Sequence, residues 1–85
     1  MDTSAIAATV RQVLLDGVLR GTNPAALEDS TPLLTGGVLD SVRTVSLIAD
    51  LERTFGISFE AFEMSVDYLD SIAHIARTIQ VKLQG

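Results

Sequence analysis

The sequence contains no cysteine and no tryptophan, and it has a single histidine. The missing thiols exclude a disulfide framework and a thiolate metal site. A metal site built on imidazoles needs several histidines, so the lone His74 excludes that kind as well. A serine nucleophile activated by histidine would depend on His74, and no serine lies in a G-x-S-x-G motif. We therefore expect no catalytic residues, no resident metal and no enzyme activity in the chain itself.

Basic residues are scarce too, because six Lys and Arg stand against eleven Asp and Glu, for a net charge of −5. This balance disfavours a nucleic-acid surface, including that of a helix-turn-helix DNA binder, since phosphate binding needs clustered basic side chains. No apolar run approaches the ~20 residues that span a membrane. The start, MDTSAIAATVRQ, lacks the basic region of a signal peptide. We expect a cytoplasmic monomer that binds neither nucleic acid nor membrane.

Hydrophobic residues make up 47% of the 85 residues, which is enough for the core of one small domain over residues 1–85. Aromatic residues are few, so this core depends on Leu, Ile, Val and Ala. Strand signals are weak, because the sequence has no Asn-Gly or Asp-Gly hairpin turn and little alternation. The apolar periodicity predicts an all-α fold: a small four-helix bundle with three main helices, one short helix, and a long loop between helices 1 and 2.

The first predicted helix is capped by Thr3 or Ser4 and extends to about Leu19. Its apolar positions follow helical spacing: Ile6, Val10, Val13 and Leu14. The long loop over residues 21–40 contains both prolines, and Asn23-Pro24 favours one short helical turn there. Four leucines are expected to attach this loop to the core: Leu27, Leu33, Leu34 and Leu39.

The second predicted helix runs from about Ser41 to Phe55, and Gly56 ends it. Its apolar positions are Val42, Val45, Ile48, Leu51 and Phe55. A short helical turn is expected near residues 65–69. Asp70 or Ser71 then caps a last helix. The apolar positions of that helix are Ile72, Ile75, Ala76, Ile79 and Leu83.

Three Asp-Ser dipeptides occur along the chain, at Asp29-Ser30, Asp40-Ser41 and Asp70-Ser71. A turn explains the first, and helix capping explains the last. Capping also explains Asp40, but it leaves Ser41 as the first helical residue with a free hydroxyl. The positive end of a helix stabilises an attached anion by about 0.3–1 kcal/mol. Ser41 is therefore a permissible site for a phosphodiester.

The run GVLDSVRTVSLIADLERTFGI, over residues 37–57, closely resembles the core of the acyl and peptidyl carrier proteins. In that family an Asp-Ser pair begins the second helix, which then reads approximately Leu-x-x-x-Leu-Glu-x-x-Phe-Gly-Ile. The matching positions here are Leu47, Leu51, Glu52, Phe55, Gly56 and Ile57. The resemblance extends to the amphipathic first helix, the Thr-Pro-Leu loop at residues 31–33, and the Tyr-Leu-Asp-Ser-Ile segment before the last helix.

The resemblance implies that Ser41 carries a 4'-phosphopantetheine arm, which a phosphopantetheinyl transferase takes from coenzyme A with magnesium bound at the transferase. It implies that Asp40 caps the helix and helps to place that metal during transfer. The thiol of the arm would hold an acyl or aminoacyl group as a thioester. The implied partners are the transferase, a loading enzyme and downstream synthase enzymes. Their recognition surface would include Val42, Arg43, Ser46, Leu47 and Asp50.

The helix after Ser41 departs from the fatty-acid carriers, which tend to have carboxylates where Arg43, Ser46 and Arg53 stand here. Our hypothesis is that the protein serves dedicated partners of a polyketide, non-ribosomal peptide or other natural-product pathway. The Leu before Asp-Ser looks closer to free-standing carriers of the D-alanyl, glyceryl and natural-product type. Arg43 is also a candidate to attract the phosphate of the arm.

Several alternatives stay open from the sequence. The cargo can be acyl, polyketide, glyceryl or aminoacyl. A rival from another class is an unmodified helical interaction or docking domain. The apolar residues near Ser41 have two interpretations, since the core explains them and a groove for cargo or partner also explains them. These residues are Val42, Val45, Leu47, Ile48, Phe62 and Met64.

Overall fold

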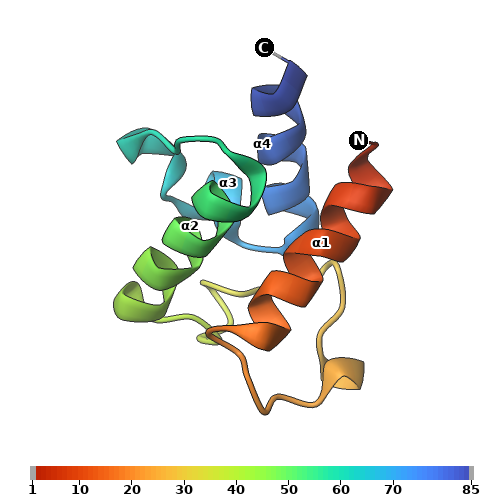
Figure 1. Cartoon of the computed structure of the whole chain (residues 1–85). Coiled ribbons are helices and arrows are strands. Elements are labelled where there is room, and N and C mark those ends of the chain that lie inside the picture. Colours follow the sequence, from red (N-terminus) through yellow and green to blue (C-terminus); the bar gives the residue numbers. More distant parts are fainter. Residues whose placement is uncertain (1, 85) are drawn as a thin grey trace.

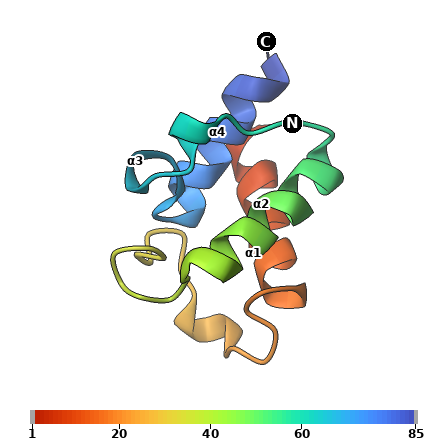
Figure 2. The same ribbon diagram turned by 90° about the vertical axis from the view of Figure 1, so that its left-hand side faces the viewer.

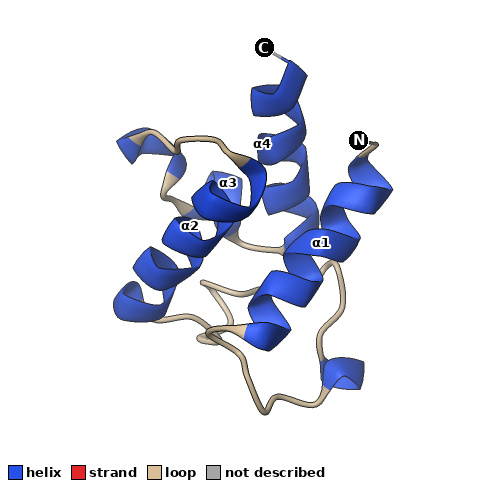
Figure 3. Cartoon of the chain, viewed as in Figure 1, coloured by secondary structure: helices blue, strands red, loops and turns tan. Residues whose placement is uncertain are grey.

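The computed structural model describes residues 2–84 of the chain and contains no strand within them. Four α-helices pack into a small bundle, and two short 3-10 turns lie in the connections (Figures 1 and 3). The elements are α1 (Thr3–Asp16), η1 (Pro24–Ala26), α2 (Ser41–Phe55), η2 (Ala61–Glu63), α3 (Val66–Leu69) and α4 (Ile72–Gln84). The predicted all-α bundle, with three main helices, a short one and a long first loop, is confirmed.

Helix α1 starts and ends earlier than the sequence predicts. Its cap is Asp2, whose carboxylate accepts a hydrogen bond from the N–H of Ala5 at 2.8 Å, and not Thr3 or Ser4. The helix ends at Asp16 because Gly17 leaves the helical conformation. A Cβ at Gly17 would lie 3.0 Å from a carboxylate oxygen of Asp50, so this glycine allows α1 and α2 to approach closely.

The core lies mainly between α1 and α4, and α2 and the long loop close it. Each of these elements, and α3 as well, contributes side chains that are almost fully buried. The largest of them are Ile6, Val10, Leu14, Leu33, Leu47, Leu51, Leu69, Ile72, Ile75 and Ile79. Among the loop leucines, Leu27, Leu33 and Leu39 are buried and Leu34 is half-buried, as expected for a loop attached to the core.

Helix α2 has the predicted bounds, and Gly56 ends it in the left-handed conformation with φ of 66°. Its predicted apolar face is partly wrong, because Val42 and Val45 are exposed by 76% and 58%. The buried positions are Thr44, Leu47, Ile48 and Leu51, which also follow helical spacing. Thr44 can enter the core because its hydroxyl donates to the carbonyl oxygen of Asp40 at 2.7 Å.

The long loop is fastened to α1 by a side chain. The guanidinium group of Arg11 donates to the carbonyl oxygens of Pro24 and Leu27, at the two ends of η1. Asn23 caps η1, with its side chain accepting from the N–H of Ala25 at 3.1 Å, so the short turn expected at Asn23-Pro24 is confirmed.

The predicted turn near residues 65–69 is present as α3. Helix α4 follows, and the hydroxyl oxygen of Ser71 accepts from the N–H of His74 at 3.1 Å, so Ser71 and not Asp70 provides the side-chain cap. Leu83 is 43% exposed, so the last predicted apolar position is not in the core. Within residues 2–84, no helix is both long and apolar enough to cross a membrane.

The first turn of α1 and the last turn of α4 lie at the same end of the molecule. Helix α2 begins away from that end, and the views in Figures 1 and 2 agree on this. Ser41 is the first residue of α2, so it is remote from both ends of the described chain.

Candidate functional site

Asp40 caps α2 in the way the sequence predicts. Its carboxylate accepts from the N–H of Arg43 at 2.8 Å, and its carbonyl oxygen accepts from the N–H of Thr44 at 2.9 Å. The hydroxyl of Ser41 is exposed and takes part in no hydrogen bond with the described residues. The N–H groups of Ser41 and Val42 likewise have no acceptor there. The start of α2 therefore offers a free hydroxyl beside free backbone donors, which suits an attached anion.

The other two Asp-Ser serines differ from Ser41. Ser71 is only 4% exposed, and its oxygen lies 2.6 Å from Nδ1 of His74. The same oxygen accepts from the N–H of His74, so the Ser71–His74 pair is accounted for as a local cap of α4. Ser30 is exposed but lies in the long loop, outside any helix. Ser41 alone combines exposure with the first position of a helix.

An open groove of about 460 Å³ lies beside Ser41, and we call it the Ser41 groove. Its lining residues come from the long loop, the first turns of α2 and the connection before α3. They are Leu34, Leu39, Asp40, Ser41, Thr44, Val45 and Met64. Most of them are apolar, so the groove suits an apolar group better than a charged one. The sequence left two interpretations of the apolar residues near Ser41. Val45 and Met64 line the groove, whereas Leu47 and Ile48 are buried in the core.

The predicted recognition residues do not form one surface. Val42, Arg43 and Ser46 are exposed on the first turns of α2. Leu47 is 1% exposed, so it belongs to the core and cannot contact a partner. Asp50 lies in a hollow against α1 and is separate from the Ser41 groove, with its carboxylate 2.5 Å from the guanidinium of Arg53.

The charges of α2 are distributed unevenly. Asp50 and Arg53 form an ion pair, and the carboxylate of Glu52 accepts from the N–H of Phe59 at 2.8 Å. Arg43 is exposed and belongs to no ion pair of residues 2–84. Among the basic residues, Arg43 is therefore the one closest to Ser41 in sequence, and its guanidinium is not engaged by a carboxylate of residues 2–84.

Asp70 has a function that sequence reasoning missed. One oxygen of its carboxylate accepts from the N–H groups of Leu34 and Thr35, both at 2.9 Å, and the other accepts from the Thr35 hydroxyl at 2.9 Å. The hydrogen bond from the Thr35 backbone is the largest influence on the pKa of Asp70 and lowers it. Burial opposes this effect, and the hydrogen bonds from the Thr35 hydroxyl and the Leu34 backbone add to the lowering. The sequence contained one signal: once Ser71 caps α4, the adjacent carboxylate is free for other donors.

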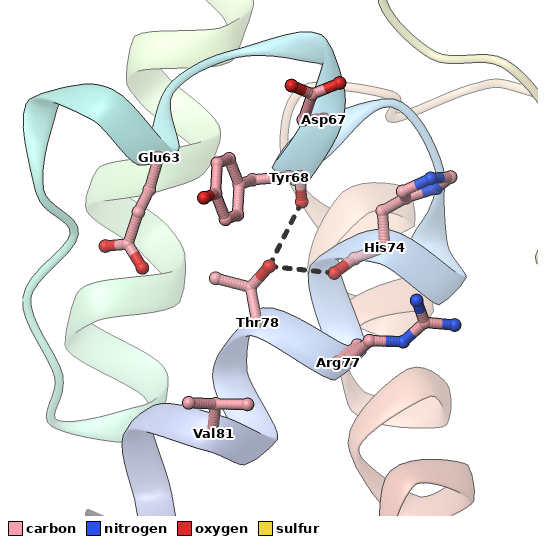
Figure 4. Close-up of a pocket in the computed structure, with 7 residues that line it drawn as sticks. All are labelled: Glu63, Asp67, Tyr68, His74, Arg77, Thr78 and Val81. Atoms are coloured by element: carbon pink, nitrogen blue, oxygen red, sulfur yellow. Dashed lines mark hydrogen bonds between the residues drawn. The ribbon is translucent and has the colours of Figure 1, made fainter.

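A second hollow, of about 280 Å³, lies between α3 and α4 (Figure 4). Its lining residues are Glu63, Asp67, Tyr68, His74, Arg77, Thr78 and Val81. The hydroxyl of Thr78 faces the carbonyl oxygens of Tyr68 and His74, at 3.4 and 3.0 Å. This hollow contains none of the residues around Ser41, and no group of three or more potential metal ligands occurs within residues 2–84.

The sequence matches no known protein family, and no curated protein is significantly similar to it. The resemblance to carrier proteins therefore stays a prediction.

Proposed function

We propose that the protein is a carrier that bears a 4'-phosphopantetheine arm on Ser41 and is not itself an enzyme. The observation that carries this proposal is the free, exposed hydroxyl at the start of α2, which opens beside an apolar groove. Neither Ser30 nor Ser71 has this combination. The arm supplies a thiol that holds an acyl or aminoacyl group as a thioester, which agrees with a chain that has no thiol of its own.

The residues around Ser41 fit the phosphodiester of such an arm. When Ser41 is loaded, its oxygen bonds to the phosphorus of the phosphopantetheine half of coenzyme A. The pyrophosphate P–O bond breaks, adenosine bisphosphate leaves, and the serine proton passes to a base of the transferase. The resulting phosphate carries one negative charge. The free N–H groups at the start of α2 stabilise that charge, as does the unpaired guanidinium of Arg43.

Exposed apolar side chains on α2 and around the start of α3 support recognition by partner enzymes. Val42 and Val45 are exposed on α2, Phe62 and Met64 are exposed in the segment before α3, and Val66 is exposed at the start of α3. Exposed apolar side chains of this kind occur at protein interaction sites. Arg43, the unpaired charged residue two positions after Ser41, is basic. A basic residue there supports dedicated partners of a natural-product pathway over the general fatty-acid synthase.

The same exposed side chains support a second candidate, an unmodified helical docking domain. Phe62 and Val42 are 65% and 76% exposed, and they would contact a partner whether or not Ser41 is modified.

If the protein is a carrier, the alternative to an acyl or polyketide cargo is an aminoacyl cargo of the D-alanyl or peptidyl kind.

The test is to incubate the protein with coenzyme A, magnesium and a broad-specificity phosphopantetheinyl transferase and to record the intact mass. We expect a single phosphopantetheine adduct on the wild-type protein and none on Ser41→Ala. Ser30→Ala is the matched control, because it removes the other exposed Asp-Ser hydroxyl and should be loaded like the wild type. A folded wild-type protein that stays unmodified would favour the docking domain.

A further inference from the structure

The residues between Leu33 and Leu39 connect the core to the start of α2 and form one side of the Ser41 groove. Leu34 and Leu39 line the groove, and Leu39 immediately precedes Asp40. The position of these two leucines therefore determines both the shape of the groove and the approach of the chain to Ser41.

This segment is a closed turn held by its own backbone. The N–H of Leu39 donates to the carbonyl oxygen of Leu33 at 2.8 Å, and the N–H of Gly37 donates to that of Leu34 at 3.2 Å. Gly37 has φ of 75°, and a Cβ at Gly36 would lie 2.3 Å from the carbonyl oxygen of Pro32. The two glycines allow a closed turn that larger residues would prevent.

The whole turn is attached to the junction of α3 and α4 through Asp70. Its carboxylate accepts three hydrogen bonds, from the backbone of Leu34 and from the backbone and hydroxyl of Thr35. Its carbonyl oxygen accepts a fourth, from the N–H of Leu33 at 2.6 Å. The four hydrogen bonds link residues 33–35 to a residue that is distant in sequence and does not itself line the groove.

We propose that Asp70 is a positioning residue for the carrier site. It holds the Leu34 side of the Ser41 groove against α2 and Met64, and in this way it determines whether the groove shelters an apolar group carried by the arm on Ser41. This inference rests on the proposed function only where it concerns cargo; the placement of the groove wall concerns the unmodified chain.

The first test uses the unmodified protein and NMR contacts between the methyl groups of Leu34, Val45 and Met64. Asp70→Ala removes the three carboxylate hydrogen bonds, and we expect it to lose the Leu34 contacts. Asp70→Asn keeps one acceptor oxygen for the two backbone N–H groups and should retain them. Thr35→Val removes only the hydroxyl donor and gives a smaller loss, which keeps the test decisive if Asp70→Ala fails to fold.

The second test uses the loaded protein and compares the hydrolysis of a hexanoyl thioester with that of an acetyl thioester. In the wild type we expect slower hydrolysis of the hexanoyl group, because the groove can shelter it. Asp70→Ala should lose this difference and Asp70→Asn should restore it. Ile6→Val is the control, since it weakens the core in α1 and should keep the difference although it lowers stability.

The outcomes separate the two proposals. Unchanged Leu34 contacts in both Asp70→Ala and Thr35→Val would overturn the positioning role. So would an unchanged hexanoyl-to-acetyl difference in Asp70→Ala. A wild-type protein that accepts no arm would instead overturn the carrier function, and the NMR test on the unmodified chain would still decide the role of Asp70.

Discussion

The ammonium group of Lys82 lies 2.5 Å from the carboxylate of Glu63, with side chains only 16% and 11% exposed. The same ammonium lies 5.3 Å from the ring centroid of Phe59. Lys82 therefore fastens the segment before α3 to the last turns of α4. Met64 follows Glu63 directly, so this ion pair supports the side of the Ser41 groove that Asp70 does not reach.

We expect Lys82→Met to destabilise the protein by about 1–3 kcal/mol, because it leaves a shielded carboxylate without its cation. Urea unfolding at neutral pH measures the change. Arg77→Met is the control. Arg77 is exposed on the same helix and forms no ion pair within residues 2–84, so its replacement should lower the free energy of unfolding by less than about 0.5 kcal/mol. Equal losses in the two variants would show that the ion pair is not needed.

Acid should weaken the fold through Glu63 and Asp70. Burial raises the pKa of Glu63, but the hydrogen bond from the backbone of Glu60 and the interaction with Lys82 together outweigh burial, so the pKa of Glu63 is lowered. The pKa of Asp70 is also lowered, mainly by the hydrogen bond from the Thr35 backbone. The unfolded chain thus binds these protons more readily. The stabilisation is complete above the unfolded pKa values of about 3.9 for Asp and 4.3 for Glu, and it is lost as pH falls through the folded values.

The measurement is the urea midpoint of unfolding as the pH is lowered below about 5. The midpoint should fall steadily in the wild type, and the slope should be shallower in Asp70→Asn, where one of the two groups can no longer titrate. The same slope in both proteins would exclude Asp70 as a source of the acid sensitivity.

Arg43→Glu should slow the loading of Ser41 by a factor of about two to five, because the charge beside the new phosphate changes sign at the end of a helix. Initial rates of adduct formation by mass spectrometry provide the measurement. Arg77→Glu makes the same change in net charge on α4, away from Ser41, and should load at the wild-type rate. If both variants slow equally, net charge and not the position of Arg43 is responsible.

Substitutions at Leu47 and Val42 should affect different properties: stability at Leu47 and recognition by a partner enzyme at Val42. Leu47→Ala should cost about 2–5 kcal/mol, because it opens a cavity at a position that is 1% exposed. Val42→Ala should change stability by less than about 0.5 kcal/mol and should instead weaken partner-dependent loading. Thermal unfolding and transferase KM, measured on both variants, test this assignment, and a destabilised Val42→Ala would contradict it.

Helix ends that are set by residues close in sequence could be predicted from capping preferences. Helix α2 has both predicted ends because Asp40 reaches the N–H of Arg43, three positions on, and Gly56 supplies a left-handed cap. The same rules predicted that Ser41 would be free. The cap of α1 was misplaced because Asp2, Thr3 and Ser4 are all suitable caps in sequence, and only the folded backbone selects one.

Long-range contacts account for the other errors. Two sets of residues in α2 follow helical spacing equally well. The predicted set includes Val42 and Val45, which are exposed, and the buried set includes Thr44 and Leu47. The choice depends on how α2 is rotated against α1, which the spacing does not determine. The Asp70 carboxylate is bound by residues 35 and 36 positions away in sequence, and no local pattern records such a contact.

The placement of the first turn of α1 and the last turn of α4 has a practical consequence for experiments on Ser41. Because the first turn of α1 and the last turn of α4 lie together, away from the start of α2, a tag or a surface linkage at either end should leave the serine accessible (Figure 2). The protein can therefore be immobilised through either end for the loading assays on Ser41. The same geometry would allow several copies to be joined in tandem, each with its serine facing outward from the linkers.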